Sequence, residues 1–268
     1  MQGRYQEDTT EQESRTCRSK IVMLHYDESM KSVQTGITRR GSRCGSTDRS
    51  KKKRGTKESM ITDQFGKKWY KGNLHTHSTN SDGRLSPEEV IGLYREEGYD
   101  FLALTDHWFM GEERREENFL LLSGAEYDVG NNVRDGIYHV VGIGMQKEPK
   151  LEKGPELQEK QAQLMIDRIH EAGGIAILAH PAWSMNRASE VRLLKDLDGC
   201  EIYNTTSGVP WNCRPYSGII LDELAAQGYV LPCMAADDAH QYTGDETKSY
   251  LMVQADELVK AHAISQAA

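Results

Sequence analysis

The sequence predicts an α/β fold in which strands and helices alternate and close into a barrel, preceded by a poorly structured N-terminal extension. From Trp69 onward, short apolar runs alternate with helical patterns, which is typical of βαβ units built on parallel strands. Seven or eight such units close naturally into a barrel whose functional loops lie at one rim. Several of the apolar runs end in His, Asp or Glu, so we expect a polar site at that rim.

Residues 1–60 differ from the rest of the chain in composition. They contain fourteen Lys and Arg against eight Asp and Glu, a net charge of +6, and few apolar residues. Such a segment cannot bury a core, so we predict a disordered extension over 1–60 and one folded domain over 61–268. Its only candidate strand is 21–26. The basic run Lys51–Arg54 could tether the chain to nucleic acid or a membrane, although a solvated tail is the simpler interpretation.

The first half of the predicted domain contains one helix and four strands. Ser86 can cap a helix that has Pro87 in its first turn and stops at Gly98. A Gly-rich turn precedes the last strand, which is therefore expected to run antiparallel to the strand before it. The charge-rich connection 108–118 is expected to be a solvated helical surface. The four predicted strands are 72–77, 101–105, 119–123 and 138–144.

The second half repeats the alternation of helix and strand. Helices are predicted at 155–172, 189–195 and 217–227, and strands at 175–179, 199–203, 230–236 and 249–254. Only a short helical tail follows the last strand. A truncated C-terminus would leave the barrel less completely closed.

Charge and cysteine usage restrict the class of partner and the compartment. Residues 61–268 carry a net charge of −14 within a total of −8, and an acidic domain does not attract polyanions. We therefore expect a small-molecule substrate and no nucleic-acid polymer. The five cysteines are widely spaced without a CxxC pair, which is typical of unpaired thiols in a reducing cytoplasm. No apolar run approaches the ~18 residues of a membrane span, and no pattern indicates the oligomeric state.

The clearest motif is His75-Thr76-His77, followed by the loop 78–83. Alternate side chains of a strand point to the same side, so both imidazoles project together from one strand end. Two imidazoles aimed at one point make half a metal site. Further along the chain, other apolar runs also end in His, Asp or Glu, and six of the nine histidines stand at such strand ends. The recurring residues are Asp106, His107, Glu126, His139, His180, Asp238 and His240.

In this order, from roughly Trp69 to Val253, these motifs resemble the polymerase and histidinol phosphatase (PHP) superfamily of metallohydrolases. The resemblance implies a distorted seven-stranded (β/α) barrel of PHP type that binds two or three divalent ions of zinc, manganese or iron. It implies three neighbouring positions. His75, His77, Glu126 and Asp238 hold one ion; Glu126 bridges to a second, held with His139 and His180; Asp82, His107 and His240 hold a third.

Such ions favour the hydrolysis of phosphate esters, because they acidify a shared water and neutralise charge on the phosphoryl oxygens. The resemblance therefore implies a hydrolase acting on a small phosphomonoester or phosphodiester, such as a nucleotide or sugar phosphate. Its catalytic residues would be Asp82, His107, Glu126, Asp238 and His240. Two alternatives remain open: hydrolysis of a carboxyl or carbamate ester within the same superfamily, and a non-catalytic module stabilised by metal.

Neighbouring residues are assigned supporting or substrate-binding roles. Asp106 is expected to orient His107 or a neighbouring loop, and Asp237 to point away from Asp238 because adjacent strand residues face opposite sides. For substrate binding, loop arginines can fork onto a phosphate, and aromatic or amide side chains can wall the pocket. The predicted substrate contacts are Arg134, Trp183, Arg187, Tyr203 and Asn204.

Overall fold

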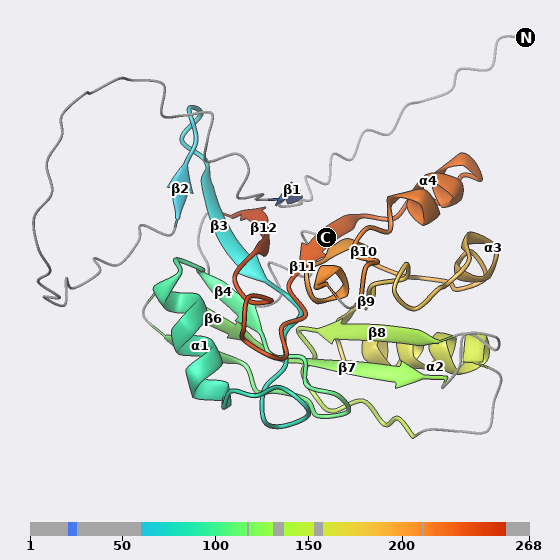
Figure 1. The fold of residues 1–268 in the computed structure, drawn as a ribbon, viewed down its shortest axis with the longest axis horizontal. Helices are drawn as coiled ribbons and strands as arrows, with labels where there is room; N and C mark the ends of the chain where they lie inside the picture. The colour runs from blue at the N-terminus through green and yellow to red at the C-terminus, as the bar shows by residue number, and fades with distance from the viewer. Residues whose placement is uncertain are drawn as a thin grey trace, which may run out of the picture.

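The computed structural model describes residues 21–25, 60–116, 118–130, 137–152, 158–210 and 212–255. Within these ranges the chain forms two β-sheets and four α-helices (Figure 1). Predictions for residues 1–20, 26–59 and 256–268 lie outside the described residues. So do Arg134 and the basic run Lys51–Arg54.

The larger sheet has seven strands in the order β1-β12-β3-β4-β6-β5, with β2 paired to β3. The neighbours β3, β4 and β6 are parallel, and the remaining pairs are antiparallel. Its strands are β1 (Ile21–His25), β2 (Ile61–Thr62), β3 (Lys68–Asn73), β4 (Phe101–Ala103), β5 (Arg114–Glu116), β6 (Phe119–Leu122) and β12 (Ser249–Gln254).

The smaller sheet has five strands in the order β11-β10-β9-β8-β7. The pairs β7–β8 and β8–β9 are antiparallel, and the pairs β9–β10 and β10–β11 are parallel. Strand β8 thus forms an antiparallel hairpin as predicted, but its partner is β7 and not the predicted strand 119–123. Its strands are β7 (Gly124–Val129), β8 (Tyr138–Ile143), β9 (Ile175–Leu178), β10 (Gly199–Asn204) and β11 (Cys233–Ala236).

The ladders of these two sheets do not close into the predicted seven-stranded barrel. The chain crosses from β6 to β7 at Ser123, and the sheets meet at two isolated parallel bridges, Thr76 with Ala239 and His107 with Glu126. Both bridges lie beside predicted ligand residues. Apolar side chains from both sheets, including Phe101 and Ile177, fill the space between them.

The helices cover the outer faces of the two sheets. Helix α1 (Pro87–Glu96) packs Val90, Ile91 and Tyr94 against the larger sheet. The smaller sheet is covered by α2 (Gln158–Glu171), α3 (Ala188–Val191) and α4 (Gly218–Ala226), which share one apolar cluster with it. A short 3₁₀ turn, η2 (Thr206–Gly208), follows β10. No helix within the described ranges is both long and apolar enough to cross a membrane.

Two local predictions need correction. The connection 108–118 was expected to be helical, but Arg114–Glu116 forms strand β5 against β6. Its charges suit a sheet edge, where Arg114 pairs with Glu88 at 2.9 Å and Glu116 pairs with Arg95. The predicted strand 119–123 corresponds to β6, but Glu126, expected just beyond its end, lies within β7 of the other sheet.

The predicted extension contributes one described element. Strand β1 pairs antiparallel with β12, from Ile21 opposite Val253 to His25 opposite Ser249. This is the segment that the sequence singled out as a candidate strand. The remainder of the proposed extension stays a prediction.

Candidate metal centre

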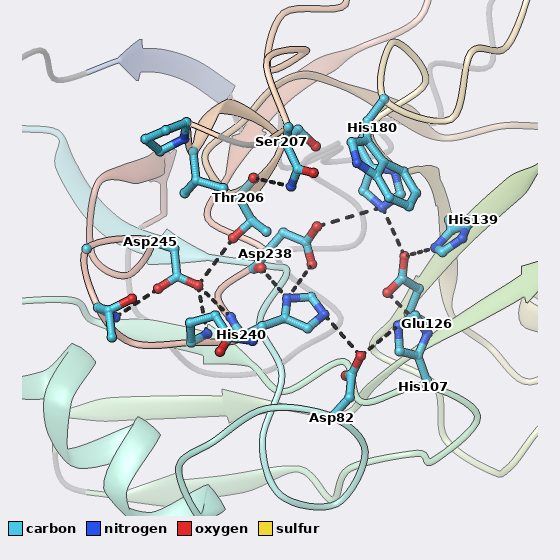
Figure 2. Close-up of a pocket in the computed structure, with 17 residues that line it drawn as sticks. Asp82, His107, Glu126, His139, His180, Thr206, Ser207, Asp238, His240 and Asp245 are labelled. Atoms are coloured by element: carbon cyan, nitrogen blue, oxygen red, sulfur yellow. Dashed lines mark hydrogen bonds and ion pairs between the residues drawn. The ribbon is translucent and has the colours of Figure 1, made fainter.

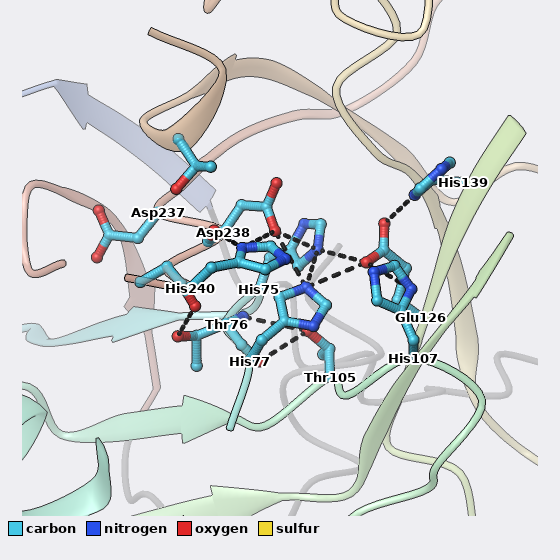
Figure 3. Close-up of polar contacts among 12 residues, drawn as sticks. His75, Thr76, His77, Thr105, His107, Glu126, His139, Asp237, Asp238 and His240 are labelled. Atoms are coloured by element: carbon cyan, nitrogen blue, oxygen red, sulfur yellow. Dashed lines mark hydrogen bonds and ion pairs between the residues drawn. The ribbon is translucent and has the colours of Figure 1, made fainter. Parts of the chain in front are cut away.

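His75 and His77 lie just beyond β3, at the edge where the two sheets meet. Backbone bonds tie this segment to both neighbours: Asp238 N–H donates to His75 O at 2.8 Å, His77 N–H to Ala239 O at 3.0 Å, and Thr105 N–H to Thr76 O at 2.9 Å. Both imidazoles are completely buried. Their Nε2 atoms point toward one another and are 3.3 Å apart (Figure 3).

Two carboxylate oxygens complete a four-atom cage with these nitrogens. Glu126 Oε2 and Asp238 Oδ1 each lie 3.1 Å from His75 Nε2 and 3.1 Å from His77 Nε2. A regular tetrahedron with edges of this length has its centre about 2 Å from each corner, which is the usual Zn–N and Zn–O bond length. The four residues that the resemblance assigned to one ion are therefore brought together at a spacing suited to a divalent cation.

The hydrogen bonding of the candidate ligand atoms also fits a cation. Asp238 Oδ1 and His107 Nδ1 are buried and have no aligned hydrogen-bond partner among the described residues. Buried polar atoms are normally satisfied, so each of these atoms is suited to a ligand. Imidazole nitrogen with carboxylate oxygen is a donor set that zinc, manganese and iron accept.

The backbone at Asp238 and His180 directs these side chains into the site. Both residues have positive φ, 55° and 26°, a region that few non-glycine residues occupy. The preceding residue, Asp237, points away from the histidines (Figure 3). Its carboxylate accepts hydrogen bonds from Tyr94 Oη at 2.7 Å and Ser249 N at 2.6 Å, so the prediction that the two aspartates face opposite ways is confirmed.

A second ligand group shares Glu126 with the cage. Glu126 Oε1 lies 2.7 Å from His139 Nδ1 and 3.2 Å from His180 Nε2, and Oε2 lies 3.5 Å from His107 Nδ1. The two oxygens of this buried carboxylate thus face two different groups of imidazoles. His107, Glu126 and His139 lie close enough together to hold an ion, and His180 adjoins them.

A third group consists of His77, Asp82, His107 and His240. Asp82 Oδ2 is 3.5 Å from His240 Nε2, and Oδ1 is 3.6 Å from His77 Nδ1. Asp82 lies on the loop that Asp106 holds, because the Asp106 carboxylate accepts from Ser78 N at 2.7 Å and Ser81 Oγ at 2.8 Å. Of the two roles predicted for Asp106, orienting a neighbouring loop is the one that the structure shows.

The charges of the centre favour an added cation. Burial opposes charge on His75, but the carboxylates of Asp238 and Glu126 outweigh it and raise its pKa well above the ordinary value. Burial likewise opposes charge on His240, yet Asp238 and Asp82 raise its pKa to about 9. The pKa of Glu126 is lowered well below its usual range by His75 and His139, despite burial. The ionised carboxylates therefore attract positive charge to this site. Protonated histidines can provide that charge, and a metal ion can provide it in their place.

The centre opens into a pocket of about 550 Å³ (Figure 2). Asp82, His107 and His240 line it with side chains that are 55%, 25% and 17% exposed, so part of the centre is accessible to a ligand. The opposite wall comes from η2, the segment after it and the loop 240–245. No Lys or Arg lines the pocket among the described residues.

Of the predicted substrate contacts, the structure places Trp183 in the pocket wall. Its indole ring lies 5.0 Å from the His180 ring and 5.8 Å from the His139 ring. Arg187 is 70% exposed and pairs with Glu190 within the first turn of α3. Tyr203 does not line the pocket, and Asn204 is buried behind it.

Glu201 is a site residue that the sequence reasoning missed. It is fully buried, and its Oε1 lies 2.6 Å from His75 Nδ1. It comes from the middle of β10, whereas the predicted site residues stand at strand ends. An acid inside an apolar strand, in Gly199-Cys200-Glu201-Ile202, is the signal that could have identified it.

The fold places this chain among known structures. No family model matches it. A two-domain protein from Bacteroides vulgatus, described as containing a predicted PHP-like metal-dependent phosphoesterase, superposes with a TM-score of 0.56 over 83% of this chain and 68% of that chain, at 17% identity. The chain therefore shares its fold with a structure described as PHP-like, in line with the resemblance noted in the sequence. At this level of identity the likeness concerns the fold alone.

Two proteins are similar in sequence over part of the chain. A 5'-3' exoribonuclease of Haemophilus influenzae is 34% identical over 114 residues, which cover 38% of this chain and 41% of that protein. An uncharacterized protein of Methanocaldococcus jannaschii is 27% identical over 150 residues, covering 50% of this chain and 81% of that protein. The match thus spans less than half the length of the exoribonuclease.

Proposed function

We propose that this chain is a metal-dependent hydrolase that cleaves a small phosphate ester. The observation that carries this proposal is the cage of four buried ligand atoms, His75 Nε2, His77 Nε2, Glu126 Oε2 and Asp238 Oδ1, with separations of 3.1–3.3 Å around the two imidazoles. The cage shares residues with the two adjoining groups, which supports a centre for two or three ions. Zinc suits the tetrahedral spacing, and manganese and iron accept the same donors.

Bound ions would acidify water and neutralise charge on a phosphate. The residues of the chain hold and orient these partners. Glu126 joins two groups through its separate oxygens, while Asp82, His107 and His240 face the pocket, where they can contact a substrate. His240 Nδ1 must donate to the carbonyl oxygen of Asp238, at 2.7 Å, because a carbonyl only accepts; this leaves Nε2 facing Asp82.

Phosphate is favoured over a carboxyl ester by the activities named for two similar proteins. One is described as an exoribonuclease and another as containing a phosphoesterase, and both names denote cleavage at phosphorus. In the described pocket wall no Lys or Arg is available to meet a phosphate, so we propose that the ions meet most of its charge. Trp183 is the best-placed of the proposed substrate contacts.

The finer description of the fold is also a proposal. The strands β3, β4, β7, β8, β9, β10 and β11 form a continuous circle if the two isolated bridges are counted with the ladders. We propose that these seven strands are the distorted barrel of the PHP type. Free thiols at Cys200, Cys213 and Cys233 support the proposed cytoplasmic location.

An activity assay tests the proposal directly. Protein loaded with zinc, manganese or iron is tested on p-nitrophenyl phosphate, bis-p-nitrophenyl phosphate, a short RNA and p-nitrophenyl acetate. His77→Ala removes a ligand of the cage, and His170→Ala is the matched control because His170 lies on α2 and pairs with Asp198 outside the centre. We expect His77→Ala to lower phosphate-ester hydrolysis at least about 100-fold, with the control unchanged. Equal activity in His77→Ala and the unaltered chain, or cleavage of the acetate alone, would overturn it.

A further inference from the structure

Behind the metal centre, Glu201 uses both carboxylate oxygens to contact candidate ligand residues. Its Oε1 lies 2.6 Å from His75 Nδ1, and its Oε2 accepts the backbone N–H of His180 at 2.8 Å. The same Oε2 accepts from Asn204 Nδ2 at 2.8 Å. Glu201 is 0% exposed and Asn204 is 1% exposed, so neither side chain reaches the pocket.

Asn204 extends these contacts to a third candidate ligand. Its Oδ1 accepts the N–H of Ser207 at 2.9 Å, which fixes the orientation of the amide because a backbone N–H can only donate. The Nδ2 group therefore faces both Glu201 Oε2 and Asp238 Oδ2, the latter at 3.2 Å. Two side chains of β10 thus contact residues that follow β3, β9 and β11.

We infer that Glu201 and Asn204 are positioning residues that set the geometry of the metal centre. With its Nδ1–H donated to Glu201, His75 presents its Nε2 lone pair toward Glu126 and Asp238, each 3.1 Å away. Asn204 holds Asp238 by Oδ2 and leaves Oδ1, the oxygen without an aligned hydrogen bond, turned toward the cage. The bond from His180 N–H to Glu201 stabilises the positive-φ backbone that directs this imidazole inward.

The energetic reason for such a pair is orientation. Partners that bind the far side of a ligand residue fix its tautomer and rotamer, and their loss typically costs 10–100-fold in metal affinity. Here one carboxylate serves an imidazole and a main-chain N–H, and one amide connects that carboxylate to another ligand. A single substitution in the pair should therefore disturb several ligands together.

This inference rests on the proposed metal binding and goes beyond it by assigning residues that touch neither substrate nor ion. Glu201→Gln keeps the shape of the side chain but replaces one acceptor oxygen by an NH₂ group. His75 Nδ1–H, His180 N–H and Asn204 NH₂ all donate hydrogen bonds to Glu201. Glutamine has only one acceptor oxygen, so its NH₂ group would be placed against at least one of these donors. Asn204→Ala is a milder variant that leaves the His75–Glu201 contact in place.

The matched control is Asp198→Asn. Asp198 Oδ2 contacts His170 Nε2 at 2.7 Å and Ala176 N at 2.8 Å, so it reproduces the imidazole and backbone partners of Glu201 outside the centre. The experiment titrates zinc into each full-length protein by calorimetry and records the visible absorption spectrum after loading with Co²⁺. Thermal unfolding of each metal-free protein reports the structural cost separately.

We expect Glu201→Gln to weaken zinc binding 10–100-fold and to change the Co²⁺ spectrum. Asn204→Ala should show a smaller change in the same direction, and Asp198→Asn should match the unaltered chain in both measurements. If Glu201→Gln does not fold, Asn204→Ala decides alone. A variant that lowers only the unfolding temperature, with affinity and spectrum unchanged, overturns the inference while the proposed function stands. Absence of metal binding in the unaltered chain overturns the proposed function first.

Discussion

Asp237 and Asp238 are adjacent in sequence but occupy different environments. Asp238 faces the imidazoles, and its pKa is lowered below its usual range because the charges of His75 and His240 outweigh burial. Asp237 lies among Tyr94, Thr205 and Ser249, and burial raises its pKa to about 6. One carboxylate is therefore suited to a cation, and the other holds together backbone and hydroxyl groups.

Alanine at each position should separate these two roles. Asp238→Ala should lose the ion of the four-atom cage. Asp237→Ala should keep that ion but lower the free energy of unfolding by about 2–4 kcal/mol, because buried N–H and hydroxyl donors lose their acceptor. Metal analysis together with urea unfolding of the metal-free proteins measures both effects. Full metal retention by Asp238→Ala would contradict the assignment.

Which individual residues the sequence could predict depended on where they stand in a strand. Most of the candidate ligand histidines, and Asp238, follow apolar runs, so strand alternation placed them at one edge; His139 instead stands at the start of its strand. Glu201 and Asn204 lie behind the site. Glu201 is 126 residues from its partner His75 in the chain, and Asn204 is 34 residues from its partner Asp238. No local pattern reports contacts of that range, so Asn204 was predicted to contact the substrate and Glu201 was not selected.

At the scale of single elements, helix α1 shows how much local chemistry can predict. Ser86 and Pro87 were expected to begin it and Gly98 to end it, and the helix spans Pro87–Glu96 with Gly98 at a φ of 74°. Glu89 accepts hydrogen bonds from Ser86 Oγ at 2.6 Å and Ser86 N at 2.9 Å. The side-chain bond and then the backbone bond from Ser86 lower the pKa of Glu89.

Removing this cap should produce a pH-dependent loss of stability. A carboxyl whose pKa is lowered in the folded state stabilises the fold above its ordinary pKa, here 4.5, and loses that contribution as the pH falls. Ser86→Ala should therefore lower the unfolding temperature at pH 7 by about 2–4 °C. The difference from the unaltered chain should shrink below pH 4.5. Thermal scans of both proteins at several pH values measure it, and a constant difference would argue against the Glu89 contact.

Strand β5 shows where local chemistry fails. The acids and bases of 112–117 are equally suited to a helix surface and a sheet edge, since both face solvent. Pairing of Arg114–Glu116 with the apolar β6, and the ion pairs to α1, decide the outcome. These are tertiary contacts, and they override a weak local preference.

For the whole molecule, the alternation of strands and helices predicted the α/β class but not how the sheets close. A barrel of consecutive units assumes that each strand pairs with the next one in the chain. Here β12, near the C-terminal end of the described residues, pairs with β3 and β1, which lie far before it in the sequence. Register across such distances depends on the completed core. The PHP resemblance supplied the barrel as an expectation, and the structure shows two sheets that meet beside the candidate ligand residues.

The proposed metal centre is tested most directly by the metal content of the 268-residue chain. Protein purified without chelator is loaded with zinc, freed of unbound ion by gel filtration, and analysed by mass spectrometry for zinc per chain. Because the candidate centre contains three ligand groups and Glu126 turns a separate oxygen toward each of two of them, we expect two or three ions per chain, with a smaller number in His75→Ala. A ratio near zero, or the same ratio in His75→Ala as in the unaltered chain, would contradict it.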